Sequence, residues 1–324
     1  MLVVLTGASG HIGGNLTRAL LEQGRSLRAL VRPEDTRALA GLKVEQVVGD
    51  LLNPASLERA FAGAEVVYHL AARISITDDD DAEVFRVNVE GTRNVVQACR
   101  RAGVRRLVHF SSVHAYHQVP LDQPIDETRP LADVASAMAY DRSKAQGEAE
   151  VMAGVGQGLD AVIVNPAVIM GPRDVNVGSG SILTEFRKHA IAVYPPGGVS
   201  VIDVGDVAFG HIAAAERGRT GARYILSGQN LWHKDVLGIA AEVVGRPRPW
   251  LRLPRFARYF EKAVDFARRQ LKMPLPISGD QVRISTETWW YDNTKARTEL
   301  GLNPRPWREA CERAWAWYQQ HGIV

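Results

Sequence analysis

Tyr140 and Lys144 have the residue types and the spacing that proton transfer requires. The i, i+4 spacing places the phenol and the ammonium group on one face of a helix, one turn apart. A free tyrosine has a pKa of about 10, too high for ready proton exchange at neutral pH, and a nearby positive charge favours its phenolate. Because most Tyr-x-x-x-Lys pairs are surface contacts within a helix, the pair indicates catalysis only if its place in the chain supports it.

Hydroxyl and amide side chains stand in the segments that precede this pair. Ser111 and Ser112 end a short apolar run, and ligands bind at the carboxyl ends of strands in open α/β sheets. A serine there can hold a carbonyl or alcohol oxygen toward Tyr140, although either serine could instead cap the following segment. We predict that Ser112 is the catalytic one. Asn88, a polar residue on an apolar helix face, either positions Lys144 through water or satisfies a backbone carbonyl.

A glycine-rich segment with the sequence TGASGHIG follows the first apolar run of the chain. The first two glycines allow a tight turn and a close approach to a pyrophosphate, and the third allows a helix to pack closely on a sheet. The helix that follows offers N–H groups and the positive end of its dipole to the phosphates. Three glycines alone would also suit a purely structural turn, but here a strand, a helix and a second strand flank them. The residues that we expect at the phosphates are Gly7, Ser9, Gly10, His11, Ile12 and Gly13.

Polar and small residues follow the next strands and favour a dinucleotide. Arg32 ends the second strand, where an acid suits the ribose hydroxyls of NAD and an arginine suits the 2′-phosphate of NADP. This favours NADP, with NAD as the alternative, because Glu34 and Asp35 stand nearby and Arg32 could be a solvated surface residue. Asp50 ends the third strand and either accepts a hydrogen bond from the adenine amine or forms a turn. The other residues expected along the cofactor are Leu51, Leu70, Ala71, Ala72, Asn88, Tyr140 and Lys144.

The first half of the chain alternates short apolar runs with helix-patterned stretches. This alternation predicts an α/β fold of the Rossmann type, in which a doubly wound parallel sheet is covered by helices on both faces. The predicted strands are Leu2–Thr6, Ser26–Val31, Val44–Val48, Glu65–Leu70, Arg106–Ser111 and Asp160–Asn165, and the predicted helices are Asn15–Gln23, Ala55–Phe61, Ala82–Arg101 and Tyr140–Ala153.

The alternation of strand-like and helix-like segments ends after Pro172, which predicts a smaller, mixed C-terminal lobe. We expect residues 1–172 to form the dinucleotide-binding domain and residues 173–324 to form mainly a substrate-binding lobe. Residues 199–216, beginning with a strand over Val199–Ile202, are expected to return to the first sheet, and Tyr224–Ser227 is predicted as an isolated strand. The basic, aromatic-rich stretch Arg255–Arg269 predicts a lid helix packed on the lobe, with a membrane-surface helix as the alternative.

Composition excludes several classes of protein. The 324 residues carry a net charge of +3, which indicates neither a nucleic-acid binder nor an acidic tail. Cys99 and Cys311 have no metal-ligand spacing around them, so we predict no disulfide and no metal site, and a reducing cytoplasm fits. The N-terminus lacks a basic region and a cleavage site, and no apolar run approaches the roughly 18 residues that span a membrane. We expect a cytoplasmic protein with a small-molecule partner, and its oligomeric state, a homodimer included, stays open.

Taken together and in this order, the motifs resemble the extended short-chain dehydrogenase/reductase family, of the NAD-dependent epimerase/dehydratase type. The matching motifs are Thr-Gly-x-x-Gly-x-x-Gly, His-Leu-Ala-Ala, Asn-Val-x-Gly-Thr-x-Asn, Ser-Ser, Tyr-x-x-x-Lys and Pro-x-x-x-x-Gly-Pro. Within the family the chain is most similar to dihydroflavonol-4-reductase-like and hopanoid-associated sugar epimerase-like proteins. The resemblance implies hydride transfer with Ser112, Tyr140 and Lys144 as the active trio. It also implies that backbone from Pro166 to Val168 holds the nicotinamide carboxamide.

One departure from the family pattern concerns the substrate. Relatives that act on nucleotide-sugars carry an arginine that grips the diphosphate, and the corresponding position here is Val199. Arg173, Arg187 or Lys188 could substitute, or each could be a solvated charge. We therefore expect an NADP-preferring reductase or dehydrogenase that acts on a small, largely uncharged molecule. The rivals are a nucleotide-sugar epimerase or dehydratase and a non-catalytic NADP-sensing protein, and the intact Tyr-x-x-x-Lys motif speaks against the last.

Overall fold

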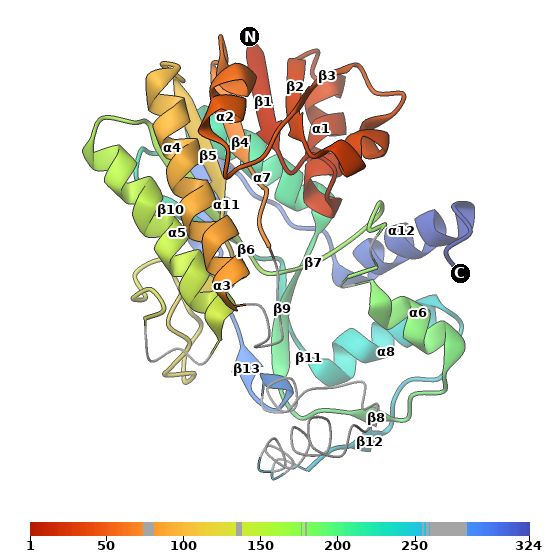
Figure 1. Cartoon of the computed structure of the whole chain (residues 1–324). Coiled ribbons are helices and arrows are strands. Elements are labelled where there is room, and N and C mark those ends of the chain that lie inside the picture. The colour runs from red at the N-terminus through yellow and green to blue at the C-terminus, as the bar shows by residue number, and fades with distance from the viewer. Residues whose placement is uncertain are drawn as a thin grey trace.

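Seven parallel strands form the central sheet of the molecule, with the order β10-β6-β5-β4-β1-β2-β3 (Figure 1). The computed structural model describes residues 1–73, 81–133, 138–175, 177–178, 180–254, 256, 259 and 284–324, with only the backbone described at 36–38 and 81. The strands of this sheet are β1 (Leu2–Thr6), β2 (Ser26–Val31), β3 (Val44–Val48), β4 (Val66–His69), β5 (Arg106–Phe110), β6 (Ala161–Pro166) and β10 (Arg223–Leu226).

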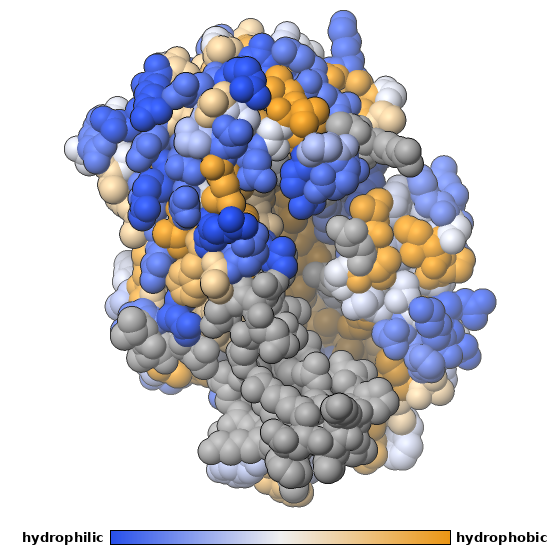
Figure 2. Space-filling view, in the orientation of Figure 1, coloured by the Kyte–Doolittle hydropathy of each residue, from blue (hydrophilic) through white to orange (hydrophobic). Residues whose placement is uncertain are grey.

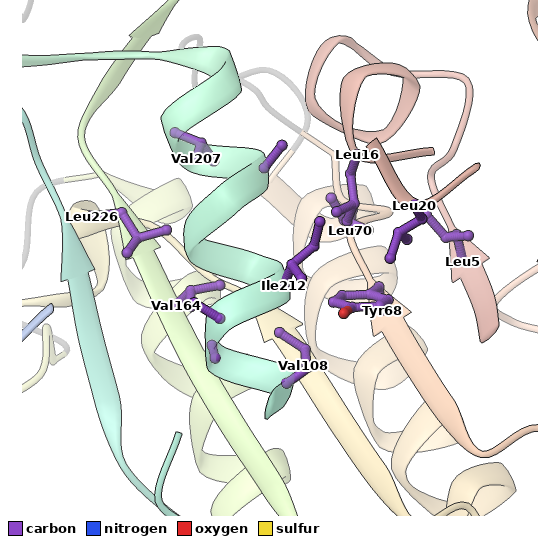
Figure 3. Close-up of a cluster of buried hydrophobic side chains, with 14 of the residues drawn as sticks. Leu5, Leu16, Leu20, Tyr68, Leu70, Val108, Val164, Val207, Ile212 and Leu226 are labelled. Carbon is purple, nitrogen blue, oxygen red and sulfur yellow. The ribbon is translucent and has the colours of Figure 1, made fainter. Parts of the chain in front are cut away.

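Helices cover both faces of this sheet, because its strands are apolar on both sides. One face packs on α1 (His11–Glu22), α7 (Val204–Arg217) and α11 (Thr294–Leu300), and the other packs on α2 (Pro54–Phe61), α4 (Gly91–Arg101) and α5 (Ala139–Gly156). Figure 3 shows the core of the first face, where Ile212 of α7 and Leu16 of α1 meet Tyr68 and Val108 of the sheet. The doubly wound Rossmann-type sheet predicted from the sequence is confirmed.

A second, smaller sheet of four strands lies beside the first. Its central strand β9 (Gly198–Asp203) pairs with β7 (Val168–Met170) and β13 (Thr288–Trp289) in parallel and with β11 (Gln229–Trp232) in antiparallel direction. It packs on α6 (Ser181–Lys188), α8 (His233–Val243) and α12 (Trp307–Gln320), which share their own apolar core. Strands β8 (Val193–Tyr194) and β12 (Leu251–Arg252) form a separate pair. Figure 2 shows a hollow between the two parts of the molecule, with hydrophobic residues inside it.

In the described part of the chain, short 3₁₀ and π-helical segments interrupt the connections. These are the 3₁₀ helices η1 (Pro33–Leu39) and η4 (Val113–Ala115) and the π-helix η3 (Arg86–Glu90). The π-helix joins α3 (Asp81–Phe85) to α4, so the single helix predicted over Ala82–Arg101 consists of three consecutive segments. The other predicted helices and strands of the first half differ from the observed ones mainly at their ends.

Two strand assignments made from the second half of the sequence are wrong. The strand over Val199–Ile202 belongs to the smaller sheet, and only the helix that follows it, α7, packs on the large sheet. Tyr224–Ser227 is not isolated, because β10 pairs with β6 and forms the edge of the large sheet. Both segments are short and apolar, and a short apolar run does not indicate which sheet it joins.

The basic stretch Arg255–Arg269 lies outside the described residues except for Phe256 and Tyr259, so its assignment as a lid stays a prediction. The division of the chain at residue 172 also stays a prediction. None of the helices that the structure describes is long and apolar enough to cross a membrane.

Candidate active site

Ser112 and Tyr140 lie where the carboxyl end of β5 meets the start of α5. Ser112 is 8% exposed and begins η4, where its Oγ accepts a hydrogen bond from the backbone N–H of His114 at 3.2 Å. The capping role that the sequence allowed for a serine is therefore present at the residue predicted as catalytic. Tyr140 is the second residue of α5, so the Tyr-x-x-x-Lys pair opens a helix as predicted. Neighbouring Ser111 is fully buried.

Lys144 is buried one turn further along α5. Its Nζ donates a hydrogen bond to the carbonyl oxygen of Phe110 at 3.2 Å and lies 6.0 Å from the centroid of the Tyr140 ring. Burial disfavours the ammonium form and lowers the pKa of Lys144 to about 8, against the opposing effect of the Glu148 carboxylate. The lysine thus stands at the end of β5, beside the tyrosine, as the sequence predicted.

The Tyr140 phenol is a neutral group at physiological pH. Burial raises the pKa of Tyr140 to about 12, hydrogen bonding to the Ser112 side chain lowers it, and the Asp141 carboxylate raises it. The chain alone therefore holds Tyr140 as a proton donor. A positive charge bound nearby would favour the phenolate.

Asn88 lies within the π-helix η3 and ties the loop after β4 to helix α5. Its Oδ1 accepts from the Arg73 N–H at 2.8 Å, and its Nδ2 donates to the Arg73 carbonyl at 2.9 Å and to the Ser143 hydroxyl at 3.0 Å. π-helical turns often occur at functional sites. Of the two roles that the sequence allowed, these contacts fit the one in which Asn88 satisfies backbone groups.

The glycine-rich segment connects β1 to α1 at the same edge of the sheet. Gly7 has φ +73°, and a Cβ there would lie 2.6 Å from the backbone nitrogen of Ala71, while a Cβ at Gly13 would lie 2.0 Å from the Gly7 carbonyl oxygen. Packing therefore requires both glycines. A Cβ at Gly10 would approach only the Gly7 oxygen, at 3.5 Å, so packing does not require this glycine. The space above Gly10 fits the close approach of a pyrophosphate.

The start of α1 suits an anion, because no side chain caps it. Ser9, His11 and Ile12 are partly buried around this turn. The His11 Nε2 lies 3.1 Å from the carbonyl oxygen of Pro172, so this side chain links the glycine-rich segment to the chain beyond β7.

Arg32 directly follows β2, and Asp50 lies two residues after β3. The Arg32 Nε donates to the Asp35 carboxylate at 2.8 Å and lies 3.4 Å from Glu34, and 61% of its side chain is exposed. Asp50 accepts from the Leu52 N–H at 2.7 Å, which is the turn-forming role that the sequence left open. Arg32 therefore has carboxylate partners of its own at the place where a ribose would lie.

The remaining predicted cofactor residues follow the carboxyl ends of the strands. They are the buried Leu51, Leu70 and Pro166, the partly buried Ala71 and Ala72, and the exposed Val168. Ala71 donates its N–H to the Thr6 hydroxyl at 3.3 Å, which ties the end of β4 to the end of β1.

A cavity of about 270 Å³ lies against the smaller sheet, and Ser112, Tyr140 and Lys144 are not among its lining residues. Its lining residues include Val113 and His114 from η4, Val168 from β7 and Val199 from β9. A larger surface hollow, of about 470 Å³ between α4 and α5, contains none of the predicted residues. No group of three potential metal ligands occurs in the described part of the chain.

His114 and Asp141 belong to this site and were not singled out from the sequence. The His114 Nδ1 lies 2.9 Å from the Asp141 Oδ1, and the His114 ring meets the Tyr140 ring edge-on, with 5.7 Å between centroids. Their positions in the sequence were the available signal, since Asp141 follows Tyr140 directly and His114 lies two residues after Ser112.

Comparison with known proteins identifies the family of the chain. The model of the NAD dependent epimerase/dehydratase family matches residues 3–226. The chain is 36% identical to sterol demethylase protein B of Methylococcus capsulatus over the full length of both. It is also 36% identical to a putative dihydroflavonol 4-reductase of Synechocystis sp., covering 99% of this chain and 95% of that protein. The crystal structure of gox2253 has a TM-score of 0.88 and 33% identity, covering 100% of this chain and 99% of that one. The chain therefore belongs to the NAD-dependent epimerase/dehydratase family of extended short-chain dehydrogenases/reductases.

Proposed function

We propose that this protein is an NADP-preferring reductase or dehydrogenase that acts on the carbonyl or alcohol of a small, largely uncharged organic molecule. The observation that carries the proposal is the grouping of Ser112, Tyr140 and Lys144 at the end of β5, where His114, whose ring centroid lies 5.7 Å from that of Tyr140, also lines a cavity together with Val199. In this assignment residues 1–172 bind mainly the cofactor and residues 173–324 bind mainly the substrate.

The proposed chemistry assigns one task to each of the three side chains. The Ser112 hydroxyl holds the reacting oxygen by a hydrogen bond, and the Tyr140 Oη donates its proton to that oxygen during reduction. The Lys144 ammonium lowers the pKa of the phenol and holds the nicotinamide ribose. When bound, the dinucleotide supplies or accepts the hydride. Lowering the pKa of Tyr140 from about 12 to near neutrality requires about 7 kcal/mol of differential stabilisation, which the chain by itself does not supply, so it needs the positive charge of the oxidised cofactor.

The preference for NADP rests on Arg32. A 2′-phosphate accepts charge-assisted hydrogen bonds from a guanidinium, and the exposed Arg32 side chain can exchange its carboxylate partners for the phosphate without losing burial. Asp35 and Glu34 compete for the same guanidinium, so the preference depends on that exchange. The positions of Gly10 and of the α1 N-terminus suit either dinucleotide.

The rival within the family is a nucleotide-sugar epimerase. It would use the same three side chains but would return the hydride to its own substrate. The cavity favours the reductase, because Asp, Glu, Lys and Arg are absent from its described lining and Val199 offers no charge to a diphosphate. The two relatives are named for a dihydroflavonol and a sterol, which are not nucleotide-sugars.

Turnover of free cofactor tests the proposal. Dialysed protein is mixed with NADPH and, in separate assays, with aldehydes, ketones, UDP-sugars and dTDP-sugars, and NADPH absorbance is followed. We expect stoichiometric and continuous NADPH consumption with carbonyl compounds. Interconversion of a nucleotide-sugar without net NADPH consumption supports the epimerase instead. If the protein binds NADPH but turns over none of these compounds, and Tyr140→Phe does not weaken NADPH binding, a sensing protein is supported.

A further inference from the structure

The cavity that His114 lines, next to Tyr140, is apolar over most of its surface and has five polar lining residues, His114, Ser200, His233, Ser285 and Tyr291. Val113, Met138, Val168, Val199, Ile284 and Trp289 supply its apolar lining. Of the polar residues, His114 is paired with Asp141, and the Tyr291 hydroxyl donates to the Gln118 Oε1 at 3.0 Å. Ser200 on β9 and His233 at the start of α8 differ from these two.

Ser200 and His233 each bury a polar atom that has no hydrogen-bond partner. Ser200 is 1% exposed, and neither its Oγ nor the Nε2 of His233 contacts a donor or an acceptor. Leaving a buried polar group unsatisfied costs about 1–3 kcal/mol, so each such group calls for an explanation. Of the residues that leave such an atom in the described part of the chain, Ser200 and His233 are the ones that line this cavity. Two such atoms on residues that line one cavity indicate that a polar group of a ligand completes their hydrogen bonds.

The chemistry of the two residues limits what that group is. A serine hydroxyl donates and accepts, and a neutral imidazole nitrogen does one or the other according to its tautomer. Burial lowers the pKa of His233 to about 4, so the imidazole is neutral at pH 7 and offers no charge to an anion. Since the described lining contains no Asp, Glu, Lys or Arg, an ionised group would be buried there without compensation.

We propose that Ser200 and His233 recognise an uncharged hydroxyl or carbonyl of the substrate at a point remote from its reacting carbon. The substrate is then a mainly apolar molecule with two oxygen functions, one held by Ser112 and Tyr140 and one held by Ser200 and His233. This inference rests on the proposed reductase function, because that function places the reacting carbon at Tyr140.

Three matched ketones test the inference by binding. The probes are 4-phenylbutan-2-one, its 4-hydroxyphenyl analogue and 4-(3-oxobutyl)benzoate, which differ only in the group at the far end. Binding is measured by calorimetry on the Tyr140→Phe variant saturated with NADP⁺, so that no turnover interferes. We expect the hydroxyl compound to bind about tenfold more tightly than the unsubstituted ketone, and the carboxylate to bind more weakly than both.

Substitutions then assign the preference to the two residues. Ser200→Ala and His233→Phe, each made in the same Tyr140→Phe background, should reduce the tenfold preference to about twofold or less, while affinity for the unsubstituted ketone stays unchanged. His233→Gln keeps a polar group and should retain part of the preference. The matched controls are Ser26→Ala and His189→Phe, two exposed positions outside the cavity, which should leave all three affinities unchanged.

If the Tyr140→Phe variant binds the phenyl and the hydroxyphenyl ketone with equal affinity, the inference is overturned. It is also overturned if the preference for the hydroxyphenyl ketone survives both Ser200→Ala and His233→Phe. NADPH consumption by the wild-type protein with the same ketones is measured separately. If the hydroxyl preference in binding is present but no ketone is reduced, the recognition site stands and the reductase function fails. If both ketones are reduced with equal kcat/KM and bound equally, the function stands and the recognition site fails.

Discussion

The Lys144 Nζ lies 6.0 Å from the centroid of the Tyr140 ring and donates a hydrogen bond to the carbonyl of Phe110. Lys144 is buried and Tyr140 is partly buried, and burial shifts each pKa toward the neutral form, upward to about 12 for Tyr140 and downward to about 8 for Lys144. The pair is therefore not poised for proton exchange by itself. Its activation depends on what binds beside it, so cofactor binding and catalysis are linked through the same lysine.

Tyr140→Phe removes the proton donor and leaves the glycine-rich segment intact. We expect kcat for carbonyl reduction to fall at least about 100-fold, the lower end of general acid–base contributions, with NADPH affinity little changed. Stopped-flow turnover and fluorescence titration of NADPH measure the two quantities. Near-normal kcat in this variant contradicts the assignment of Tyr140.

The pKa of Lys144 predicts how cofactor binding depends on pH. The ammonium form, which we propose to hold the nicotinamide ribose, is populated below the pKa of about 8 and is lost as the pH rises through it. We expect the Kd for NADPH to be constant below pH 8 and to rise above it, by up to about tenfold per pH unit. Lys144→Met should bind NADPH more weakly at every pH and lack this rise. A wild-type Kd that stays constant up to pH 10 contradicts the prediction.

The large sheet and its glycine-rich turn could be predicted from the sequence because their signals are local. Each strand is a short apolar run, and the turn requires glycine at Gly7 and Gly13 for reasons visible in contacts with neighbouring backbone. The order of Ser112, Tyr140 and Lys144 along the chain also predicted that they lie close together, because the carboxyl ends of parallel strands lie along one edge of the sheet.

The rest depends on contacts between distant segments. The strand β9 joins the smaller sheet because it pairs with β7 and β11, and nothing in its own residues distinguishes that sheet from the large one. His233 follows β11 in sequence, and only the fold brings it to a cavity with Val113 and Met138. The ion pairs of Arg32 with Asp35 and Glu34 were likewise not foreseen, although the two acids were noted beside it.

Arg32→Ala should weaken NADPH far more than NADH. A charge-assisted contact with the 2′-phosphate contributes about 1.5–3 kcal/mol, which corresponds to about one to two decades in affinity. Fluorescence titration with both cofactors measures the difference, and Arg59→Ala, at an exposed position of α2, is the control. Equal weakening of both cofactors, or none, means that Arg32 is a surface charge and that NAD is the cofactor.

Asp35→Asn tests the same contact from the opposite direction. Its carboxylate accepts a hydrogen bond from the Arg32 Nε at 2.8 Å and so competes with a bound phosphate. We expect the substitution to tighten NADPH severalfold relative to NADH, as measured by the same titration. A change in favour of NADH would indicate that Asp35 does not compete with the phosphate.

Asp203→Ala should destabilise the junction between β9 and α7. The Asp203 Oδ1 accepts from the Gly205 N–H at 2.6 Å, capping α7, and pairs with Arg313 at 2.7 Å and Arg305 at 3.4 Å. Both arginines are more than a third exposed and regain water, so we expect a loss of about 1–3 kcal/mol in the free energy of unfolding. Urea denaturation measures it, with Glu58→Ala, an exposed ion-pair control, expected to change stability by at most about 0.5 kcal/mol.

Val199, which the family resemblance places where nucleotide-sugar enzymes are expected to carry a diphosphate-binding arginine, lines the cavity. A buried diphosphate needs charged hydrogen-bond donors, and the described lining of this cavity offers none. We therefore expect UDP- and dTDP-sugars to bind with Kd values of about 1 mM or weaker in calorimetric titration of the dialysed protein. We also expect the cofactor to be lost on dialysis, because a reductase releases its oxidised dinucleotide after each turnover. Micromolar binding of a nucleotide-sugar, together with a dinucleotide that remains bound through dialysis, would overturn the reductase assignment in favour of the epimerase.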